Sequence, residues 1–427
     1  MGRITEIAME GNRVSHDVQE DSSSKQALDA VHGVTLKSQM DDPLRACVHC
    51  GFCLESCPTY QLSGDENNSP RGRLLLWRGV EEQRIEEDEW VDHYTKQCVG
   101  CLSCESVCPA NVPYGHLLET TRRQQVESKR IRYNWKIRWA TKLVQSPRLF
   151  QWLNLPIRLL RRLNLPVHPF LFPGSPSVVQ TSRAYCQHMM QKLQPTGPQV
   201  ALLTGCLMDA VFREINFATI DALIAANCRV VIPEEQTCCG ALHEHTGMEG
   251  HSELAEQNRN AFESLSVEAV LTNSAGCGHS LQKSLAESDI PVEDVLQFLS
   301  RTERFQQAVS SQSNKGNQKL YVDLPCHLVH GQKVDGIPEN LLDATGYSWS
   351  LAPNARDCCG SGGVYNVENP SNAKQILQNK AAFLDALPAE IEPIIVTANH
   401  VCMMQWNSAK SLVKRPFKVK HVVQLLT

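Results

Sequence analysis

The sequence predicts a helical, cysteine-rich N-terminal domain of α+β class followed by two copies of an α/β domain. A four-cysteine motif occurs twice in the first part, and an internal repeat fills the second part. Within each repeat, strand-like and helix-like segments alternate, which is typical of a parallel or mixed α/β sheet. The expected ranges are a mobile polar tail (1–42), the cysteine-rich domain (43–120), a basic helical connector (121–196), and the two α/β domains (197–312 and 317–427).

Length and composition are those of a globular chain with several domains. The 427 residues allow about three domains at roughly 150 residues each. Hydrophobic residues make up 42% and charged residues 20%, and the net charge of −5 is too small to indicate a class of partner. No run of about 18 apolar residues predicts a membrane-spanning helix, and the first residues contain no apolar segment of a secretory signal. We therefore expect a cytoplasmic protein whose 18 cysteines are metal ligands or redox groups rather than a disulfide framework.

The cysteine-rich domain contains two copies of one motif, CVHCGFCLESCP at residues 47–58 and CVGCLSCESVCP at residues 98–109. The repeated spacing C-x2-C-x2-C-x3-C-P is the pattern of bacterial ferredoxins with two iron–sulfur clusters. Three thiolates on a tight loop each reach one iron, and the fourth cysteine ligates the other cluster. We therefore predict two [4Fe–4S] clusters, each bound by one set of four cysteines. Ferredoxin set 1 is Cys47, Cys50, Cys53 and Cys108, and ferredoxin set 2 is Cys98, Cys101, Cys104 and Cys57.

A pair of zinc sites is the alternative for these cysteines. Zinc is usually bound by two C-x2-C pairs separated by a longer loop, and three evenly spaced cysteines with a fourth before proline do not fit that pattern.

Gly51 and Gly100 allow the chain to pass close to a cluster. Arg71 and Arg73, between the motifs, either contact cluster sulfides or a partner's acidic surface, or are ordinary arginines that face solvent or pair with carboxylates.

The connector is strongly basic. Between Thr121 and His168 it contains twelve Lys or Arg residues and one acid, Glu127, with Trp135, Trp139 and Trp152 among them. A basic helix with Trp and Leu on its other side can lie on an anionic membrane surface. It can equally dock on an acidic partner subunit or pack along the acidic domains of its own chain, and these interpretations remain open. Nucleic acid is disfavoured because no binding module accompanies the basic residues.

The second part of the chain is an internal duplication. The first copy contains LLTGC, TCCGA and LTNSAGCG, and the second contains VDLPC, DCCGSGG and VTANHVC. Each Cys-Cys-Gly triplet begins 32 residues after a cysteine that ends a strand-like run, and the copies are offset by 120 residues at the first two landmarks and by 125 at the third. Cysteines that follow strands are expected at the carboxyl edge of the sheet, where open α/β folds bind ligands. Repeat set 1 is Cys206, Cys238, Cys239 and Cys277, and repeat set 2 is Cys326, Cys358, Cys359 and Cys402.

Three roles are open for the repeat sets. Adjacent cysteines do not easily bind one metal ion, but they can ligate two irons of a further iron–sulfur cluster. They can also form a strained redox disulfide, or be remnants of the duplication in which cysteine acts as a small apolar residue. His279, His327 and His400 lie close to these cysteines in the sequence, and each is a ligand, a proton carrier or an ordinary hydrogen-bonded histidine. Cys186 and Cys228 match neither copy and are expected to be plain thiols.

In this order, ACVHCGFCLESCPTY, SPRGR, the second ferredoxin motif, the two CCG triplets, SAGCG and VTAN resemble the iron–sulfur subunit of glycolate oxidase (glycolate dehydrogenase) over residues 43–427. The resemblance implies a heteromeric enzyme. An FAD-containing partner oxidises glycolate to glyoxylate, and this chain, which supplies no catalytic residue, passes the electrons to a membrane acceptor such as a quinone on the inner face of the cytoplasmic membrane. No G-x-G-x-x-G follows a strand-like run, which agrees with a substrate site on another subunit.

Related architectures leave alternatives for the function. Iron–sulfur subunits of D-lactate and glycerol-3-phosphate dehydrogenases and heterodisulfide reductases are similar, and a stand-alone disulfide reductase and a non-enzymatic iron–sulfur scaffold are further hypotheses. In heterodisulfide reductases the Cys-Cys-Gly domain typically ends in C-x2-C and binds noncubane clusters. Here Ser274 and Asn399 stand at the first cysteine of that pair, so the sequence departs from that ligand set in both copies.

Overall fold

The computed structural model describes residues 43–146, 180–302 and 318–426. The predicted tail (1–42) and residues 147–179 of the predicted connector lie outside the described residues. None of the helices in the described ranges is long and apolar enough to cross a membrane. The helices that precede the first strand are α3 (Phe52–Glu55), α4 (Pro58–Ser63), η1 (Glu66–Asn68), α5 (Pro70–Glu81), α6 (Glu89–Lys96), α7 (Ser103–Ser106), α8 (Tyr114–Glu127), α9 (Trp135–Val144) and α11 (Ser182–Leu193).

Local signals set the start of the longer N-terminal helices. Ser69 caps α5, because its hydroxyl accepts a hydrogen bond from the N–H of Gly72 in the first turn. Pro70 takes the first helical position, where no N–H is needed. α6 begins at Asp88, whose carboxylate accepts from two N–H groups of the first turn. The two helices pack together, and Trp77 Nε1 donates to Thr95 Oγ1 at 2.9 Å between them.

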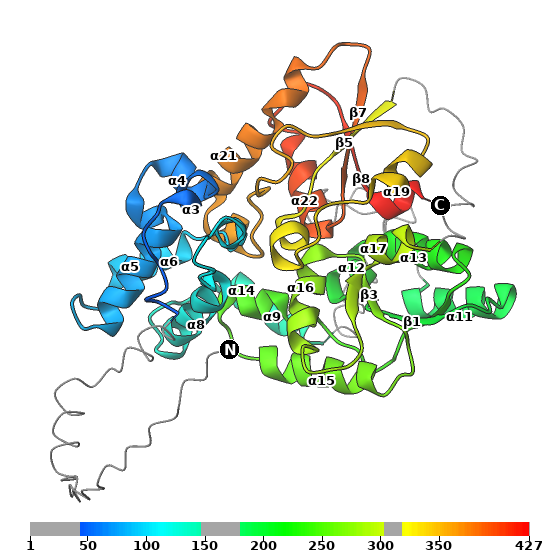
Figure 1. The fold of residues 1–427 in the computed structure, drawn as a ribbon, viewed down its shortest axis with the longest axis horizontal. Helices are drawn as coiled ribbons and strands as arrows, with labels where there is room; N and C mark the ends of the chain where they lie inside the picture. The colour runs from blue at the N-terminus through cyan, green and yellow to red at the C-terminus, as the bar shows by residue number, and fades with distance from the viewer. Residues whose placement is uncertain (1–42, 147–179, 303–317, 427) are drawn as a thin grey trace, which may run out of the picture.

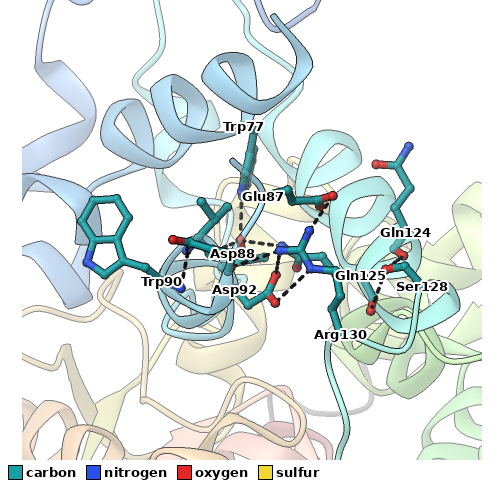
Figure 2. Close-up of polar contacts among 11 residues, drawn as sticks. Trp77, Glu87, Asp88, Trp90, Asp92, Gln124, Gln125, Ser128 and Arg130 are labelled. Atoms are coloured by element: carbon teal, nitrogen blue, oxygen red, sulfur yellow. Dashed lines mark hydrogen bonds and ion pairs between the residues drawn. The ribbon is translucent and has the colours of Figure 1, made fainter. Parts of the chain in front are cut away.

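Arg130 fixes the chain after α8 to α6 (Figure 2). Its guanidinium lies 2.7 Å from the carboxylate of Asp92 and 2.5 Å from that of Glu87, and it donates to the backbone oxygen of Asp88 at 3.0 Å. Asp92 is buried, and a buried carboxylate is costly unless it is paired. The basic connector therefore leaves the N-terminal part of the protein from a fixed point.

Each repeat folds as a four-stranded sheet with helices between the strands. The first repeat consists of β1 (Gln199–Leu202), α12 (Cys206–Val211), α13 (Arg213–Ala225), β2 (Arg229–Val231), α14 (Ala241–Thr246), α15 (His251–Glu263), β3 (Val270–Thr272), α16 (Ala275–Ser284), β4 (Val292–Asp294) and α17 (Val295–Ser300). The second consists of β5 (Gln318–Val322), η2 (His327–Gly331), α19 (Glu339–Ala344), β6 (Ser348–Leu351), α20 (Tyr365–Glu368), α21 (Pro370–Ala381), η3 (Ala382–Ala386), β7 (Glu392–Thr397), α22 (His400–Ala409), β8 (Lys418–His421) and η4 (Val422–Leu425).

The two sheets have the same topology. Their strand orders are β2-β1-β3-β4 and β6-β5-β7-β8, and all neighbouring strands are parallel. The apolar runs that the sequence indicated as strands form β1, β3, β5 and β7, whose residues are mostly buried. The predicted class, a helical N-terminal part followed by duplicated α/β domains, is confirmed.

One apolar core is shared by both repeats. It contains Val200 and Leu202 of the first sheet and Leu320 and Val396 of the second, all without exposed surface. Because hydrophobic stabilisation grows with the apolar area removed from water, this continuous core favours a fixed arrangement of the two sheets. Figure 1 shows the second repeat above the first, with helices α3 to α6 beside them.

The N-terminal part contacts both repeats. α8 packs on α14 of the first repeat, and α4 packs on α21 of the second. The repeats meet where α16 packs on η2, and these two elements follow the carboxyl ends of β3 and β5. Segments that follow strand ends therefore meet at one junction between the three parts of the molecule.

Asp294 predicts a pH dependence of stability. Its Oδ1 accepts from the N–H of Leu296 at the start of α17, but Oδ2 is buried without a hydrogen-bond partner among the described residues. Burial raises the pKa of this carboxyl to about 7. The folded protein thus binds a proton at Asp294 more tightly than the unfolded chain does. The resulting contribution to the free energy of unfolding is complete below about pH 4 and is lost as the pH rises through about 7.

We expect Asp294→Asn to flatten the fall in melting temperature between pH 5 and pH 8, because the amide keeps the cap without a buried charge. Thermal unfolding at both pH values measures this difference. Asp88→Asn, at the exposed cap of α6, is the matched control. An unchanged slope in the Asp294 variant would show that this carboxyl does not set the pH dependence.

Candidate iron–sulfur centres

The two ferredoxin loops have the same backbone conformation. In the first loop, the residues on either side of Cys50 have positive φ, His49 at 56° and Gly51 at 87°. In the second, Gly100 at 74° and Leu102 at 63° flank Cys101 in the same way. Left-handed residues that alternate with ordinary ones form a concave nest of N–H groups, which is common at iron–sulfur sites. Each loop therefore has two left-handed residues but glycine at only one of them, after the middle cysteine in the first loop and before it in the second. The positions of the glycines in the sequence therefore do not show that the two loops have the same backbone conformation.

Ferredoxin set 1 lines a cavity at the surface. Its four cysteines share this cavity with Cys104, Tyr114 and Arg71. Cys50 is exposed, whereas Cys108 reaches the cavity from the second motif. The structure thus brings together the four thiols that the spacing of the two motifs assigned to one cluster.

Ferredoxin set 2 lies deeper. Burial, followed by the neighbouring thiols Cys101 and Cys98, raises the pKa of Cys104 well above its ordinary value. Burial also raises the pKa of Cys57, the member that comes from the first motif, and Cys101 contributes to this shift. The hydroxyl of Tyr114 donates to Cys98 Sγ at 3.5 Å. Four crowded sulfurs of this kind ionise together only when a positively charged group replaces their protons, which is what iron binding supplies.

Repeat set 1 gathers at the carboxyl edge of the first sheet. Cys206 begins α12 after β1, Cys238 and Cys239 precede α14, and Cys277 lies in the first turn of α16 after β3. The sulfur atoms of Cys206 and Cys238 are 3.4 Å apart, and Cys239 and Cys277 are close enough to shift each other's pKa. Gly240 has a φ of 85°, which explains the glycine of the triplet.

Repeat set 2 is arranged in the same way and also touches the N-terminal part. The sulfur atoms of Cys359 and Cys402 are 3.4 Å apart, and Cys358 packs with Cys326 in a buried cluster. Cys358 also packs with Cys101 of ferredoxin set 2 in a buried cluster, and this neighbour holds the pKa of Cys101 at about 6 although burial raises it. Val99 packs into the same buried cluster. Ferredoxin set 2 and repeat set 2 are therefore in direct contact.

Comparisons with known proteins agree with this arrangement. Residues 43–112 match a 4Fe-4S dicluster domain, and residues 200–282 and 322–407 match a cysteine-rich domain. A probable glycolate oxidase iron-sulfur subunit of Bacillus subtilis (strain 168) is 34% identical over 410 residues, 86% of this chain and 90% of that protein. The glycolate oxidase iron-sulfur subunit of Escherichia coli (strain K12) is 31% identical over 401 residues, 87% of this chain and 91% of that protein. The chain belongs to the glycolate oxidase iron–sulfur subunit family.

A shorter relative has a different name. A lactate utilization protein A of Exiguobacterium sp. (strain ATCC BAA-1283 / AT1b) is 25% identical over 241 residues, which cover 54% of this chain and 97% of that protein. For this member of the glycolate oxidase iron–sulfur subunit family, the dicluster match confirms the predicted [4Fe–4S] clusters and favours them over zinc. The crowded, buried thiols described above fit such clusters.

Two arginines of the SPRGR segment support the ferredoxin sets in this family member. Arg71 pairs with Glu66, Nε to Oε1 at 2.6 Å, and donates to the backbone oxygen of His49 at 3.2 Å. Arg73 has no exposed surface and donates to the backbone oxygen of Tyr94 at 2.7 Å. Burial opposes the charge of Arg73, but Tyr114 and the cysteines beside it raise its pKa. Arg71 is thus the expected carboxylate-bound arginine, whereas Arg73 places a buried positive charge beside ferredoxin set 2.

Arg122 is a further site residue that sequence analysis did not single out. We counted it only among the cations of the connector, but it is buried and donates to the backbone oxygens of Cys98 at 2.6 Å and His245 at 2.8 Å. It therefore links the second ferredoxin loop to α14 of the first repeat. No sequence pattern marks it, because its partners are backbone atoms far apart in the chain.

The two repeat sets differ in charge. Beside repeat set 2, Lys380 Nζ lies 2.7 Å from Asp323 Oδ1, and both side chains are buried. The neighbouring thiols Cys358 and Cys402 hold the pKa of Cys359 well below its ordinary value, and Lys380 adds to this shift. Leu203 stands 120 residues before Asp323, at the corresponding place in the first repeat. Only repeat set 2, of the two, therefore has this buried ion pair.

Ser274 and Asn399, which replace the first cysteine of the C-x2-C pair, contact each other between the repeats. Ser274 Oγ donates to Asn399 Oδ1 at 3.1 Å and lies 3.0 Å from His400 Nδ1. Asn399 Nδ2 donates to Cys402 Sγ at 3.4 Å, and Ser274 hydrogen-bonds with Cys277. His400 is therefore an ordinary hydrogen-bonded histidine, and these polar residues take the place of two thiols.

Three histidines meet where the second ferredoxin loop faces both repeats. The ring of His327 lies 5.0 Å from that of His245 and 5.6 Å from that of His279, and all three line a small cavity with Gly100 and Glu119. Burial, with the charge of Arg122, lowers the pKa of His245 to about 3, so the imidazole is neutral. Within the described residues, no three His, Cys, Asp or Glu side chains converge closely enough to hold a single metal ion.

Cys186 and Cys228 lie apart from these sets. Both are buried in the shared core, and burial raises the pKa of Cys186 to about 12 and that of Cys228 to about 11. Their thiols therefore stay protonated at neutral pH, as expected for plain structural cysteines.

Arg73→Met is expected to lower the reduction potential of the cluster at ferredoxin set 2. The substitution removes a buried positive charge that favours the reduced, more negative cluster. A redox titration followed by electron paramagnetic resonance measures this potential. Arg71→Met, beside ferredoxin set 1, is the control and should leave it unchanged. Equal potentials in the Arg73 variant and the wild type, at full iron content, would contradict the assigned role.

Proposed function

We propose that the chain relays electrons from glycolate, oxidised to glyoxylate on an FAD-containing partner subunit, to a membrane acceptor such as a quinone. In this proposal ferredoxin sets 1 and 2 are the ligands of the two [4Fe–4S] clusters, and the protein works on the inner face of the cytoplasmic membrane. When bound, each cluster would take up and release one electron at a time. The observation that carries the proposal is the contact between Cys101 and Cys358, which joins the ferredoxin part to repeat set 2.

The cysteine sets follow one another from the surface into the molecule. Cys50 of ferredoxin set 1 is exposed. Burial and then Cys47 raise the pKa of Cys53, which belongs to the same set. Cys57 of ferredoxin set 2 raises the pKa of Cys53 further, so the two sets are close neighbours. Cys101 then contacts the second repeat. A continuous series of this kind supports a relay between two partners rather than an isolated cluster site.

The chemistry of glycolate supports a separate flavin subunit. Oxidation of glycolate to glyoxylate releases two electrons and two protons from one carbon and its hydroxyl, whereas the ligands on this chain suit one-electron carriers. No G-x-G-x-x-G follows β1, β3, β5 or β7. A flavin on the partner accepts the electron pair and passes single electrons on, and the residues of this chain position the acceptors.

A heterodisulfide-type reductase is the second candidate. Cys359 and Cys402 have sulfur atoms 3.4 Å apart, and the pKa of Cys359 is held well below its ordinary value. Such a pair can cycle between a dithiol and a disulfide with two electrons and two protons. D-lactate or glycerol-3-phosphate is the alternative substrate of a partner dehydrogenase, and the similarity to a lactate utilization protein supports lactate, of either enantiomer, over glycerol-3-phosphate.

The test is reconstitution under anaerobic conditions. The purified chain is expected to be brown and to contain about eight iron atoms or more. Glycolate should reduce its clusters only after the FAD-containing partner is added, and the chain alone should reduce no disulfide. Glycolate oxidation by the chain alone would contradict the proposal, whereas disulfide turnover would favour the second candidate.

Substitutions in the two repeats should differ in their effect on ferredoxin set 2. Cys358→Ala is expected to change the electron paramagnetic resonance signal of that cluster, because Cys358 packs beside Cys101 in a buried cluster. Cys238→Ala, the matched change in the first repeat, should leave the signal unchanged. If both variants give the wild-type spectrum, the contact does not connect the two sets.

A further inference from the structure

Helix α9 presents two tryptophans to solvent. Trp135 is 72% exposed and Trp139 is 57% exposed, and they are four residues apart, so they lie on the same face of the helix. The opposite face is anchored, since Ile137 and Thr141 are buried there and Ile137 packs in an apolar cluster of the protein. A tryptophan has a large apolar ring and usually removes it from water. Two adjacent exposed indoles on a well-packed helix therefore indicate a surface that is covered by something else.

Basic residues surround these two rings. From Ser128 to Ser146 the chain contains no Asp or Glu. Two other cations of the connector are used inside the protein, Arg122 on backbone oxygens and Arg130 on the carboxylates of Glu87 and Asp92 shown in Figure 2. The cations near the two tryptophans are instead exposed and form no ion pair with an acid in the described part of the chain. They are Arg132, Lys136, Arg138 and Lys142.

From these observations we propose that α9 binds an anionic lipid surface, with the helix axis parallel to the membrane. Trp135 and Trp139 enter the boundary between headgroups and acyl chains, where the amphipathic indole is favoured. The surrounding cations lie at the level of the headgroups and attract anionic lipids. We define the lipid-binding face as Trp135, Trp139, Arg132, Lys136, Arg138 and Lys142.

The composition of this face favours lipid over a protein partner. Lysine is depleted at protein–protein interfaces, whereas lysine and arginine beside tryptophan are typical of helices that lie on membranes. The helix is also formed before binding, because Asn134 caps it and Thr141 donates to Ile137 on its inner face. The inference goes beyond the electron relay and does not rest on it, so either can fail without the other.

The experiment measures binding of the full, iron-loaded chain to vesicles. Phosphatidylcholine vesicles with about one third phosphatidylglycerol are compared with pure phosphatidylcholine at low and high salt. We expect the wild type to sediment with the anionic vesicles and to be released by salt, because exposed charges are screened. Trp135→Ser combined with Trp139→Ser should weaken binding at least tenfold, and Lys136→Glu combined with Lys142→Glu should abolish the preference for anionic lipid.

Matched controls come from other exposed residues. Trp90→Ser removes a tryptophan that is 49% exposed on α6, and Lys192→Glu combined with Lys374→Glu makes the same charge change elsewhere. Both controls should bind vesicles as the wild type does. Iron content and circular dichroism, unchanged in every variant, show that folding is intact.

Two results would overturn the proposal. One is unchanged or absent vesicle binding. In that case the wild-type chain does not sediment with anionic vesicles at low salt, or the double tryptophan variant binds them as tightly as the wild type. The other is a double tryptophan variant that keeps vesicle binding but no longer associates with the FAD-containing partner, which would make this face a protein interface. Glycolate-dependent cluster reduction in solution should stay normal in the variants, which separates this test from that of the relay.

Discussion

The contact between the second ferredoxin loop and the second repeat is the interaction on which the arrangement depends. Cys101 and Cys358 pack together in a buried cluster, and Arg122 ties the same loop to the first repeat through the backbone oxygens of Cys98 and His245. The loop is thus held from both sides by parts of the chain more than a hundred residues away. Such contacts fix the position of ferredoxin set 2 relative to the sheets, and with it the order of the cysteine sets.

Duplication gave the two repeats one topology, but their cysteine sets differ in surroundings. Both keep the loop geometry of the Cys-Cys-Gly triplet, with φ of 85° at Gly240 and 80° at Gly360. The second set touches the ferredoxin part and has the buried pair of Asp323 and Lys380 beside it, whereas Leu203 stands at the position of Asp323 in the first repeat. Breaking a buried ion pair is strongly destabilising, so the pair constrains which substitutions the second repeat tolerates.

The sequence predicted the cysteine loops, the duplication and the parallel α/β class, because these depend on local spacing and on apolar periodicity. Spacing also placed Cys108 with the first three cysteines, and the structure has it in the same cavity; the assignment of Cys57 and Cys108 as ligands stays a prediction. The contact of Cys101 with Cys358 could not be predicted, since it depends on how three parts pack together. The role of Arg122 was missed for a related reason, because an arginine that donates to backbone oxygens leaves no pattern in the residue types around it. Arg73 was named from the sequence, but its place beside the cysteines was one of two open alternatives.

Anomalous scattering at the iron absorption edge, from crystals grown without oxygen, shows directly whether the ferredoxin cysteines hold two iron clusters and whether the inner cluster lies beside the second repeat. We expect two iron peaks in the N-terminal part, one near exposed Cys50 and one enclosed by Cys57, Cys98, Cys101 and Cys104. The enclosed peak should lie beside Cys358 of repeat set 2. Absence of iron from the eight ferredoxin cysteines, or an enclosed cluster with no contact to the second repeat, would contradict it.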